Sequence, residues 1–178
     1  SILNCAAYGT IETEYKNGSF SNGDGTPFDS IFIGGIISNC IKNSVTTIES
    51  CIWAGTFVDK TDLGEKANLA AYGTFNGTIT VNNCYYLEGS APYVTTNEYQ
   101  SGGIVKVTPA QLTSGEIAYK LGSAWGQEIG KDTYPVPGGA KVYYGYTSCG
   151  NSEMIYTNNV NAGEEKPEHS YVDGLCEV

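Results

Sequence analysis

A short segment that returns along the chain constrains the fold more than any other feature of the sequence. Asn4–Ile11 reads NCAAYGTI, Ser50–Phe57 reads SCIWAGTF, Asn83–Ser90 reads NCYYLEGS, and Ser38–Ile41 is a partial fourth copy. Each copy is too short to bury its own apolar side chains, so the copies must stack on one another. The repeat therefore predicts short strands stacked about 4.8 Å apart, with equivalent residues aligned.

The composition favours strands over helices. The chain has 23 Gly and 14 Tyr, and only 16% of its residues are charged, which is typical of short strands joined by tight turns. Between the copies lie β-branched runs punctuated by Gly and Asn, such as Gly34–Ile37 and Tyr72–Val81. We therefore expect a mainly all-β fold, a right-handed β-solenoid or β-helix with a short helical cap and a C-terminal strand and loop extension.

The expected cap begins where the repeats end. Thr108–Gln111 has the pattern of a capping box with Pro109 at the first helical position, and Ser114 with Glu116 can restart a second short helix, so we predict helix over 109–121. Apolar cover for the last turn of the coil is expected from Trp125, Ile129 and Tyr134. The predicted organisation is solenoid repeats over 1–106, a helical and Trp-containing capping segment over 107–140, and a C-terminal extension with a Cys/His tail over 141–178.

The six cysteines fall into two groups. The first lies within strand patterns, where free Cys behaves as a small buried hydrophobe, so we predict buried and mostly reduced thiols; disulfides within the group are the alternative. This group is Cys5, Cys40, Cys51 and Cys84.

The second group lies in a polar tail beside the single His. A structural disulfide between Cys149 and Cys176 is the main prediction, and unpaired thiols are the alternative. Cys149, His169 and Cys176 are also weak candidates for metal ligands. Oxygen-bearing residues alternate in the segment 22–29, which is either a turn-rich excursion or a calcium loop that lacks the closing Glu of an EF-hand.

A catalytic site is hard to assemble from this sequence. His169 is the sole His, no Gly-x-Ser-x-Gly turn occurs, and the carboxylates are scattered, so we predict no enzyme activity and no cofactor. Aromatic rings stack on the apolar faces of sugars, which makes exposed aromatic residues the candidate ligand-binding residues. These candidates are Trp53, Tyr72, Tyr85 and Tyr86.

The charge narrows the range of partners. A formal net charge of −10 opposes electrostatic binding to nucleic acid or anionic lipid, and no apolar stretch approaches the roughly 20 residues of a membrane span. We therefore predict no nucleic-acid partner and no membrane insertion. The strand-like first residues suggest a fragment of a longer, processed multidomain chain.

Two parts of the chain resemble known bacterial repeat proteins. Gly34–Ile36 followed by Ile48–Thr56 resembles the GLUG-type repeats of bacterial surface proteins and of regions flanking some IgA-cleaving metallopeptidases, a likeness that covers residues 1–106. Cys84–Leu87, Leu112–Leu121 and Trp125–Val136 are similar to the block that closes the solenoid in many gut-bacterial surface proteins.

The resemblance implies an extracellular or cell-surface location and a non-enzymatic role in adhesion or surface presentation. The implied partner is a glycan or protein on a host or bacterial surface. Two alternatives are a carbohydrate-binding accessory domain of a larger extracellular enzyme and a β-helix polysaccharide-degrading enzyme. An enzyme of that last kind needs an acidic cluster and a base on one sheet face, which the nine basic residues do not visibly supply.

Overall fold

A computed structural model describes most of the chain. The described residues are 1–14, 31–38, 40, 43–60, 67–72, 77–95, 103–139, 142, 146–148, 151–154, 170–172 and 175–177. They belong to two compact units, Ser1–Pro109 and Ala110–Val178, where the sequence led us to expect three segments.

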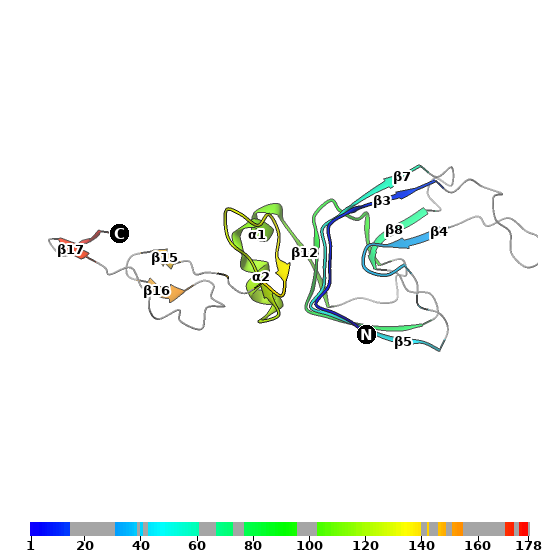
Figure 1. The fold of residues 1–178 in the computed structure, drawn as a ribbon, viewed down its shortest axis with the longest axis horizontal. Coiled ribbons are helices and arrows are strands. Elements are labelled where there is room, and N and C mark those ends of the chain that lie inside the picture. The colour runs from blue at the N-terminus through cyan, green and yellow to red at the C-terminus, as the bar shows by residue number, and fades with distance from the viewer. Residues whose placement is uncertain are drawn as a thin grey trace, which may run out of the picture. The chain divides into compact units, whose positions relative to one another are not determined.

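The first unit is built from parallel strands (Figure 1). Its sheets run in the orders β1-β5-β9, β12-β10-β6-β2, β11-β8-β4 and β3-β7. The strands are β1 (Ile2–Leu3), β2 (Ala6–Ala7), β3 (Thr10–Thr13), β4 (Ile31–Gly34), β5 (Val45–Glu49), β6 (Ile52–Trp53), β7 (Thr56–Asp59), β8 (Ala67–Tyr72), β9 (Thr78–Asn82), β10 (Cys84–Leu87), β11 (Tyr93–Thr95) and β12 (Ile104–Val107).

The repeated segments pair with one another in register. Ile2 lies opposite Ile48, and Ile48 lies opposite Val81 in the next strand. Likewise Ala6 pairs with Ile52, and Ile52 pairs with Tyr85. We call each set of strands at one level a tier: tier 1 is β1, β2 and β3, tier 2 is β5, β6 and β7, and tier 3 is β9 and β10.

The predicted right-handed β-solenoid is wrong. The described strands form separate small sheets of two to four strands, parallel in the first unit and antiparallel in the second, and they do not close into a coil. Paired residues lie 46 positions apart between tiers 1 and 2 and 33 apart between tiers 2 and 3, so the stretches that join paired strands differ in length. The repeat predicted which strands pair, but the pairing of short strands does not by itself specify a closed coil.

Each tier turns a corner at the residue just before the Cys position of the internal repeat. Asn4, Ser50 and Asn83 have φ angles of 51°, 50° and 48°, and Gly103 takes the same place before β12 with φ 79°. Asn adopts this left-handed conformation more readily than most residues, and Gly adopts it without steric cost. The Asn83 side chain also donates a hydrogen bond to the Ser50 hydroxyl (3.2 Å). The Asn or Ser of each copy is therefore a corner residue.

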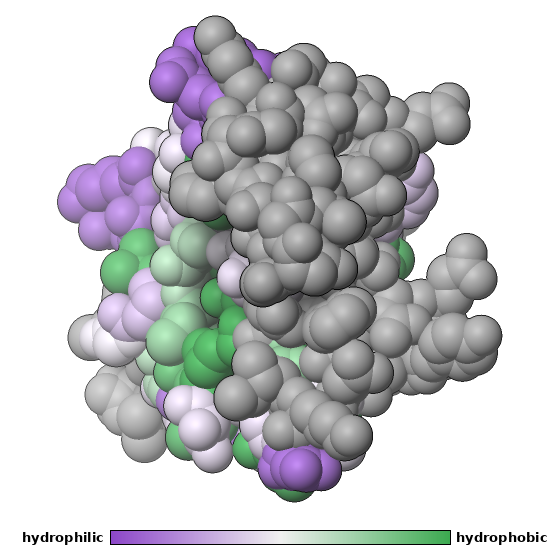
Figure 2. Space-filling model, turned by 90° about the vertical axis from the view of Figure 1, so that its right-hand side faces the viewer, coloured by the Kyte–Doolittle hydropathy of each residue, from purple (hydrophilic) through white to green (hydrophobic). Residues whose placement is uncertain are grey.

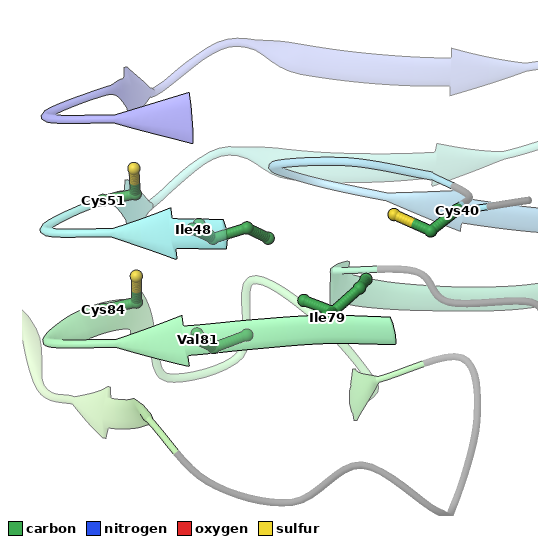
Figure 3. Packing of buried hydrophobic residues seen from close by; sticks show 6 residues of the cluster. All are labelled: Cys40, Ile48, Cys51, Ile79, Val81 and Cys84. Atoms are coloured by element: carbon green, nitrogen blue, oxygen red, sulfur yellow. The ribbon is translucent and has the colours of Figure 1, made fainter. Parts of the chain in front are cut away.

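Buried side chains from different tiers form the core of the first unit. Figure 3 shows one cluster, in which Ile48 and Cys51 of tier 2 lie above Val81 and Cys84 of tier 3. Cys40 and Ile79 complete this cluster. A second cluster contains Trp53, Ala71 and Tyr86. Equivalent positions in the repeat thus become columns of packed side chains.

Some large hydrophobic side chains reach the surface. Leu3, Val45, Tyr93 and Val105 are more than half exposed. On the face that Figure 2 shows, hydrophobic residues lie in the open between hydrophilic ones. Scattered exposed residues of this kind are ordinary.

The second unit contains the helices and the antiparallel strands. Helix is observed in α1 (Pro109–Ser114) and α2 (Glu116–Leu121), which confirms the helix predicted over 109–121. Of the three residues expected to give apolar cover, Trp125 is buried, Tyr134 is partly exposed and Ile129 is half exposed. The strands pair as β13 (Trp125–Gly126) with β14 (Val136–Pro137), β15 (Tyr146–Ser148) with β16 (Asn151–Met154), and β17 (Ser170–Val172) with β18 (Leu175–Glu177).

A buried glutamine links the helices of this unit to the loop that follows them. The Gln127 amide donates hydrogen bonds to the carbonyl oxygens of Leu112 (2.7 Å) and Asp132 (3.2 Å). In the described residues, no helix is long and apolar enough to cross a membrane.

Candidate functional site

Three of the four aromatic residues predicted to bind a ligand are buried. Trp53, Tyr85 and Tyr86 expose 1%, 8% and 9% of their surface. The Trp53 indole N–H donates to the Ser90 carbonyl oxygen (3.2 Å), and the Tyr85 hydroxyl donates to Asn83 Oδ1 (2.9 Å). Tyr72 lies in β8, and its side chain is outside the described residues. The three described rings pack in the protein and offer no open face for a sugar.

The other sequence-based candidates fall outside the described part of the chain. Cys149, His169 and the segment 22–29 are not described, and Cys176 is described only by its backbone in β18. The disulfide, the metal site and the calcium loop therefore stay predictions. Within the described residues, no group of three or more His, Cys, Asp and Glu side chains could hold a metal ion.

An ordered polar surface does form on the sheet β1-β5-β9. In β9, Thr78, Thr80 and Asn82 are exposed, while Ile79 and Val81 between them are buried. This alternation follows from the pleat of a strand, in which successive side chains point to opposite faces. The sequence signal for this surface is the alternation of polar and apolar residues in Thr-Ile-Thr-Val-Asn of β9, which a search for exposed aromatic residues does not select.

Tier 2 extends this surface in register. Thr47 lies opposite Thr80, Val45 lies opposite Thr78, and Glu49 lies opposite Asn82. We call the surface formed by these six residues the threonine face. Three opposed pairs therefore run across the tiers: two hydroxyl groups at Thr47 and Thr80, a carboxylate beside an amide at Glu49 and Asn82, and an apolar side chain beside a hydroxyl at Val45 and Thr78.

The threonine face is suited to hydrogen bonding. Hydroxyl groups and an amide can both donate and accept hydrogen bonds, so they can match the polar groups of a glycan or a peptide. Glu49 is the single carboxylate among these six residues, whereas glycoside hydrolysis uses a pair of carboxylates.

A second set of polar contacts joins β3 to β7. The hydroxyl oxygens of Thr10 and Thr56 lie 3.4 Å apart, and the Thr13 hydroxyl donates to Asp59 Oδ1 (2.9 Å). An exposed ion pair, Lys60 to Glu12, spans the same two tiers at 2.6 Å. The polar side chains of β3 and β7 thus bind one another across the two tiers. The threonine face is therefore the better candidate for an external ligand.

The repeated cysteines form a column across the tiers. Each sulfur donates to the carbonyl oxygen two residues earlier: Cys5 to Leu3 (3.1 Å), Cys51 to Glu49 (3.2 Å) and Cys84 to Asn82 (3.2 Å). All are free thiols, as is Cys40. Predicted burial is confirmed for Cys40, Cys51 and Cys84 and is wrong for Cys5, which is exposed because the strand that follows it, β2, is the last strand of its sheet.

The two buried thiols of the column influence each other. A hydrogen bond with the Cys51 sulfur raises the pKa of Cys84, and burial raises it further. Partial desolvation and the neighbouring Cys51 also raise the pKa of Cys5. The same hydrogen bond with Cys84 lowers the pKa of Cys51 to about 6, so Cys51 is the thiol of this pair that loses its proton first.

Comparisons with known proteins give no further assignment. The chain matches no protein-family model, and no curated protein or solved structure is similar to it.

Proposed function

We propose that the chain is a non-enzymatic adhesion or surface-presentation module of a secreted or cell-surface bacterial protein. The observation that supports this most is the threonine face, which holds hydroxyl, amide and carboxylate groups in rows across two paired strands. Its partner is a polar glycan or protein on a host or bacterial surface. The net charge of −10 disfavours a polyanion as the partner, because like charges repel.

Rigidity makes this face suitable for recognition. The inward neighbours of the face residues, Ile48, Ile79 and Val81, are buried in one cluster. Threonine is β-branched, so its side chain has few rotamers to lose when it is held by a partner. Little ordering is then required on binding, and pre-organised groups of this kind convert more of their contacts into affinity.

The two alternative functions fit the structure less well. A carbohydrate-binding accessory domain would normally stack sugars on several neighbouring exposed aromatic rings, and of the candidate rings Trp53, Tyr85 and Tyr86 are buried, which leaves Tyr93 as an exposed ring of the first unit. A polysaccharide-degrading enzyme would need at least two cooperating acid or base groups, and the threonine face contains one carboxylate. Presentation of hydrogen-bonding groups needs neither feature.

Binding to a glycan array, followed by titration with the strongest ligand, tests the proposal. Changing Thr47→Ala and Thr80→Ala together should weaken binding about 10-fold or more, because two hydrogen bonds of about 1 kcal/mol each are lost. Thr10→Ala with Thr56→Ala is the matched control, since it removes two paired hydroxyl groups from another sheet. Equal losses in both variants would contradict the proposal, as would turnover of pectin, glycan or casein substrates that stops when one carboxylate is changed.

A further inference from the structure

Tier 1 is paired on one side only. β1 and β2 are terminal strands of their sheets, and β3 pairs only with β7, so within the described residues none of the three has a strand on its other side. Three consecutive strands thus form one open edge over residues 1–14. Unpaired strand edges are places where a further strand can add.

The exposure of equivalent residues shows that this edge is incompletely covered. Ile48, Cys51 and Ile52 of tier 2 are completely buried. Their counterparts in tier 1 are Ile2 and Ala6, which are partly exposed, and Cys5, which is exposed. The side chains occupy the same positions in the repeat and differ in having a neighbouring tier on one side or on both. The residues of tier 2 are buried because tier 1 lies on one side of them and tier 3 on the other. A further tier on the open side of tier 1 would bury the tier 1 residues in the same way.

Two equivalent glycines give independent evidence. A Cβ atom on Gly55 would lie 2.2 Å from the Gly9 carbonyl oxygen, so the close approach of tier 1 requires glycine in tier 2. Gly9 holds the same place in tier 1, yet a Cβ there would meet nothing within 4 Å, and its φ angle is not in the left-handed region. Nothing in the described structure requires glycine at position 9. A carbonyl group of a further tier, placed as Gly9 is placed against Gly55, would require it.

The cysteine column points toward the same edge. The Cys51 sulfur lies 3.4 Å from the backbone nitrogen of Cys5 and 3.6 Å from the Ile2 carbonyl oxygen, so it faces tier 1. In Figure 3 the sulfurs of Cys51 and Cys84 point the same way along the stack. Cys5 repeats the Cys51 contact with the carbonyl two residues earlier, and its sulfur is exposed at the edge.

We propose that β1, β2 and β3 are a docking edge for a further tier, an extended segment that carries the repeat pattern of this chain and pairs in parallel. The segment has Asn, Ser or Gly at the corner opposite Asn4, a small residue opposite Cys5 and glycine opposite Gly9. A basic residue opposite Glu12 would complement Glu14, because Glu14 holds the place in tier 1 that Lys60 holds in tier 2, and Lys60 pairs with Glu12 of the neighbouring tier. This inference does not depend on the proposed adhesive function.

Other occupants fit less well. A second copy of the whole chain would bring two net charges of −10 together, which opposes association at low salt. A helix or an irregular segment would not supply the backbone groups that a parallel strand edge pairs with. A segment with the repeat pattern continues an interface that already exists between tiers 1 and 2.

A tandem variant tests the proposal with the full chain. A second copy of residues 1–46 is placed before Ser1, which reproduces the 46-residue spacing between Thr10 and Thr56. The added copy carries Cys5→Ala and Cys40→Ala, so that alkylation of the original Cys5 can be followed by mass spectrometry. Docking of the added tier should slow this alkylation about 10-fold or more, because a covered thiol reacts only after local opening. Unchanged alkylation of Cys5 would overturn the proposal.

Gly9→Ala in the original copy is the specific control. It should leave the melting temperature of the unextended chain unchanged, because the added Cβ lies in open space, and it should restore fast alkylation of Cys5 in the tandem variant. Protection that persists with Gly9→Ala would refute the proposed register. Protection of Cys5 that rises with concentration in the unextended chain, together with a dimer in size-exclusion chromatography, would identify a second copy as the occupant and contradict the one proposed.

Discussion

Replacing Gly103 with alanine is expected to unfold the first unit. A Cβ atom at this position would lie 1.5 Å from the Val81 carbonyl oxygen and 2.2 Å from its carbonyl carbon, so the two backbones could not keep their present distance. The amide of Cys84 also donates to the Gly103 carbonyl oxygen (2.8 Å), and displacement of the corner would break this bond between β10 and β12. We expect a loss of about 4 kcal/mol or more, at the extreme of single substitutions.

Gly89→Ala separates the steric clash from the cost of the backbone conformation. Gly89 has the same φ angle of 79°, but a Cβ there would meet nothing within 4 Å. Holding alanine in the left-handed region costs about 1–2 kcal/mol, and this is all that Gly89→Ala should lose. Urea unfolding followed by circular dichroism measures both variants. Similar losses in the two would show that β12 does not approach β9 as closely as described.

Replacing Trp53 with alanine should remove the centre of the second core cluster. The indole ring lies where side chains of Gly35 and Gly55 would otherwise be, since a Cβ atom on either would come within 2.4 Å of a ring carbon. It also contacts the Phe57 ring, with centroids 5.0 Å apart. Truncating a buried Trp to alanine typically costs about 3–5 kcal/mol. The loss here should lie in that range, since the surrounding backbone has no side chains at Gly35 and Gly55 with which to fill the cavity.

Trp53→Phe is the matched control for volume and hydrogen bonding. It keeps an aromatic ring but leaves the Ser90 carbonyl oxygen without its indole donor, which should cost about 1–3 kcal/mol. The chain has two Trp residues, so Trp125 fluorescence in either variant follows the second unit while circular dichroism follows the strands. A Trp53→Ala protein that is as stable as the Trp53→Phe protein would mean that Trp53 is not buried between the tiers.

The sequence was informative where a local pattern has one structural solution. The Asn-Cys and Ser-Cys pairs predicted equivalent positions in stacked strands, and those positions do pair, as Ile2 does with Ile48. Pro109 with its flanking residues predicted the helix of 109–121. Both signals depend on neighbours in sequence, so the chain alone carries them.

Other features depended on contacts that a sequence pattern does not contain. The sequence does not show whether the rings of Tyr85 and Tyr86 face solvent or the core, and in the structure both are buried. The left-handed corner at Asn4 does have a sequence signal, because Asn precedes Cys in three of the four copies. The need for glycine at Gly35 comes from the ring of Trp53, eighteen residues away in the chain and adjacent in space.

The in-register pairing of tiers underlies the threonine face and the docking edge alike, and a short thiol cross-linker tests it most directly. In a Thr10→Cys, Thr56→Cys variant the two side chains start from hydroxyl oxygens 3.4 Å apart and are exposed. A short reagent with two thiol-alkylating groups should join the two cysteines in high yield, and the product is identified as a cross-linked peptide by mass spectrometry. Thr10→Cys with Val58→Cys, displaced by two residues along β7, should react poorly because diagonal neighbours lie about 7–8 Å apart. Equal yields, or a higher yield for the displaced pair, would contradict the account.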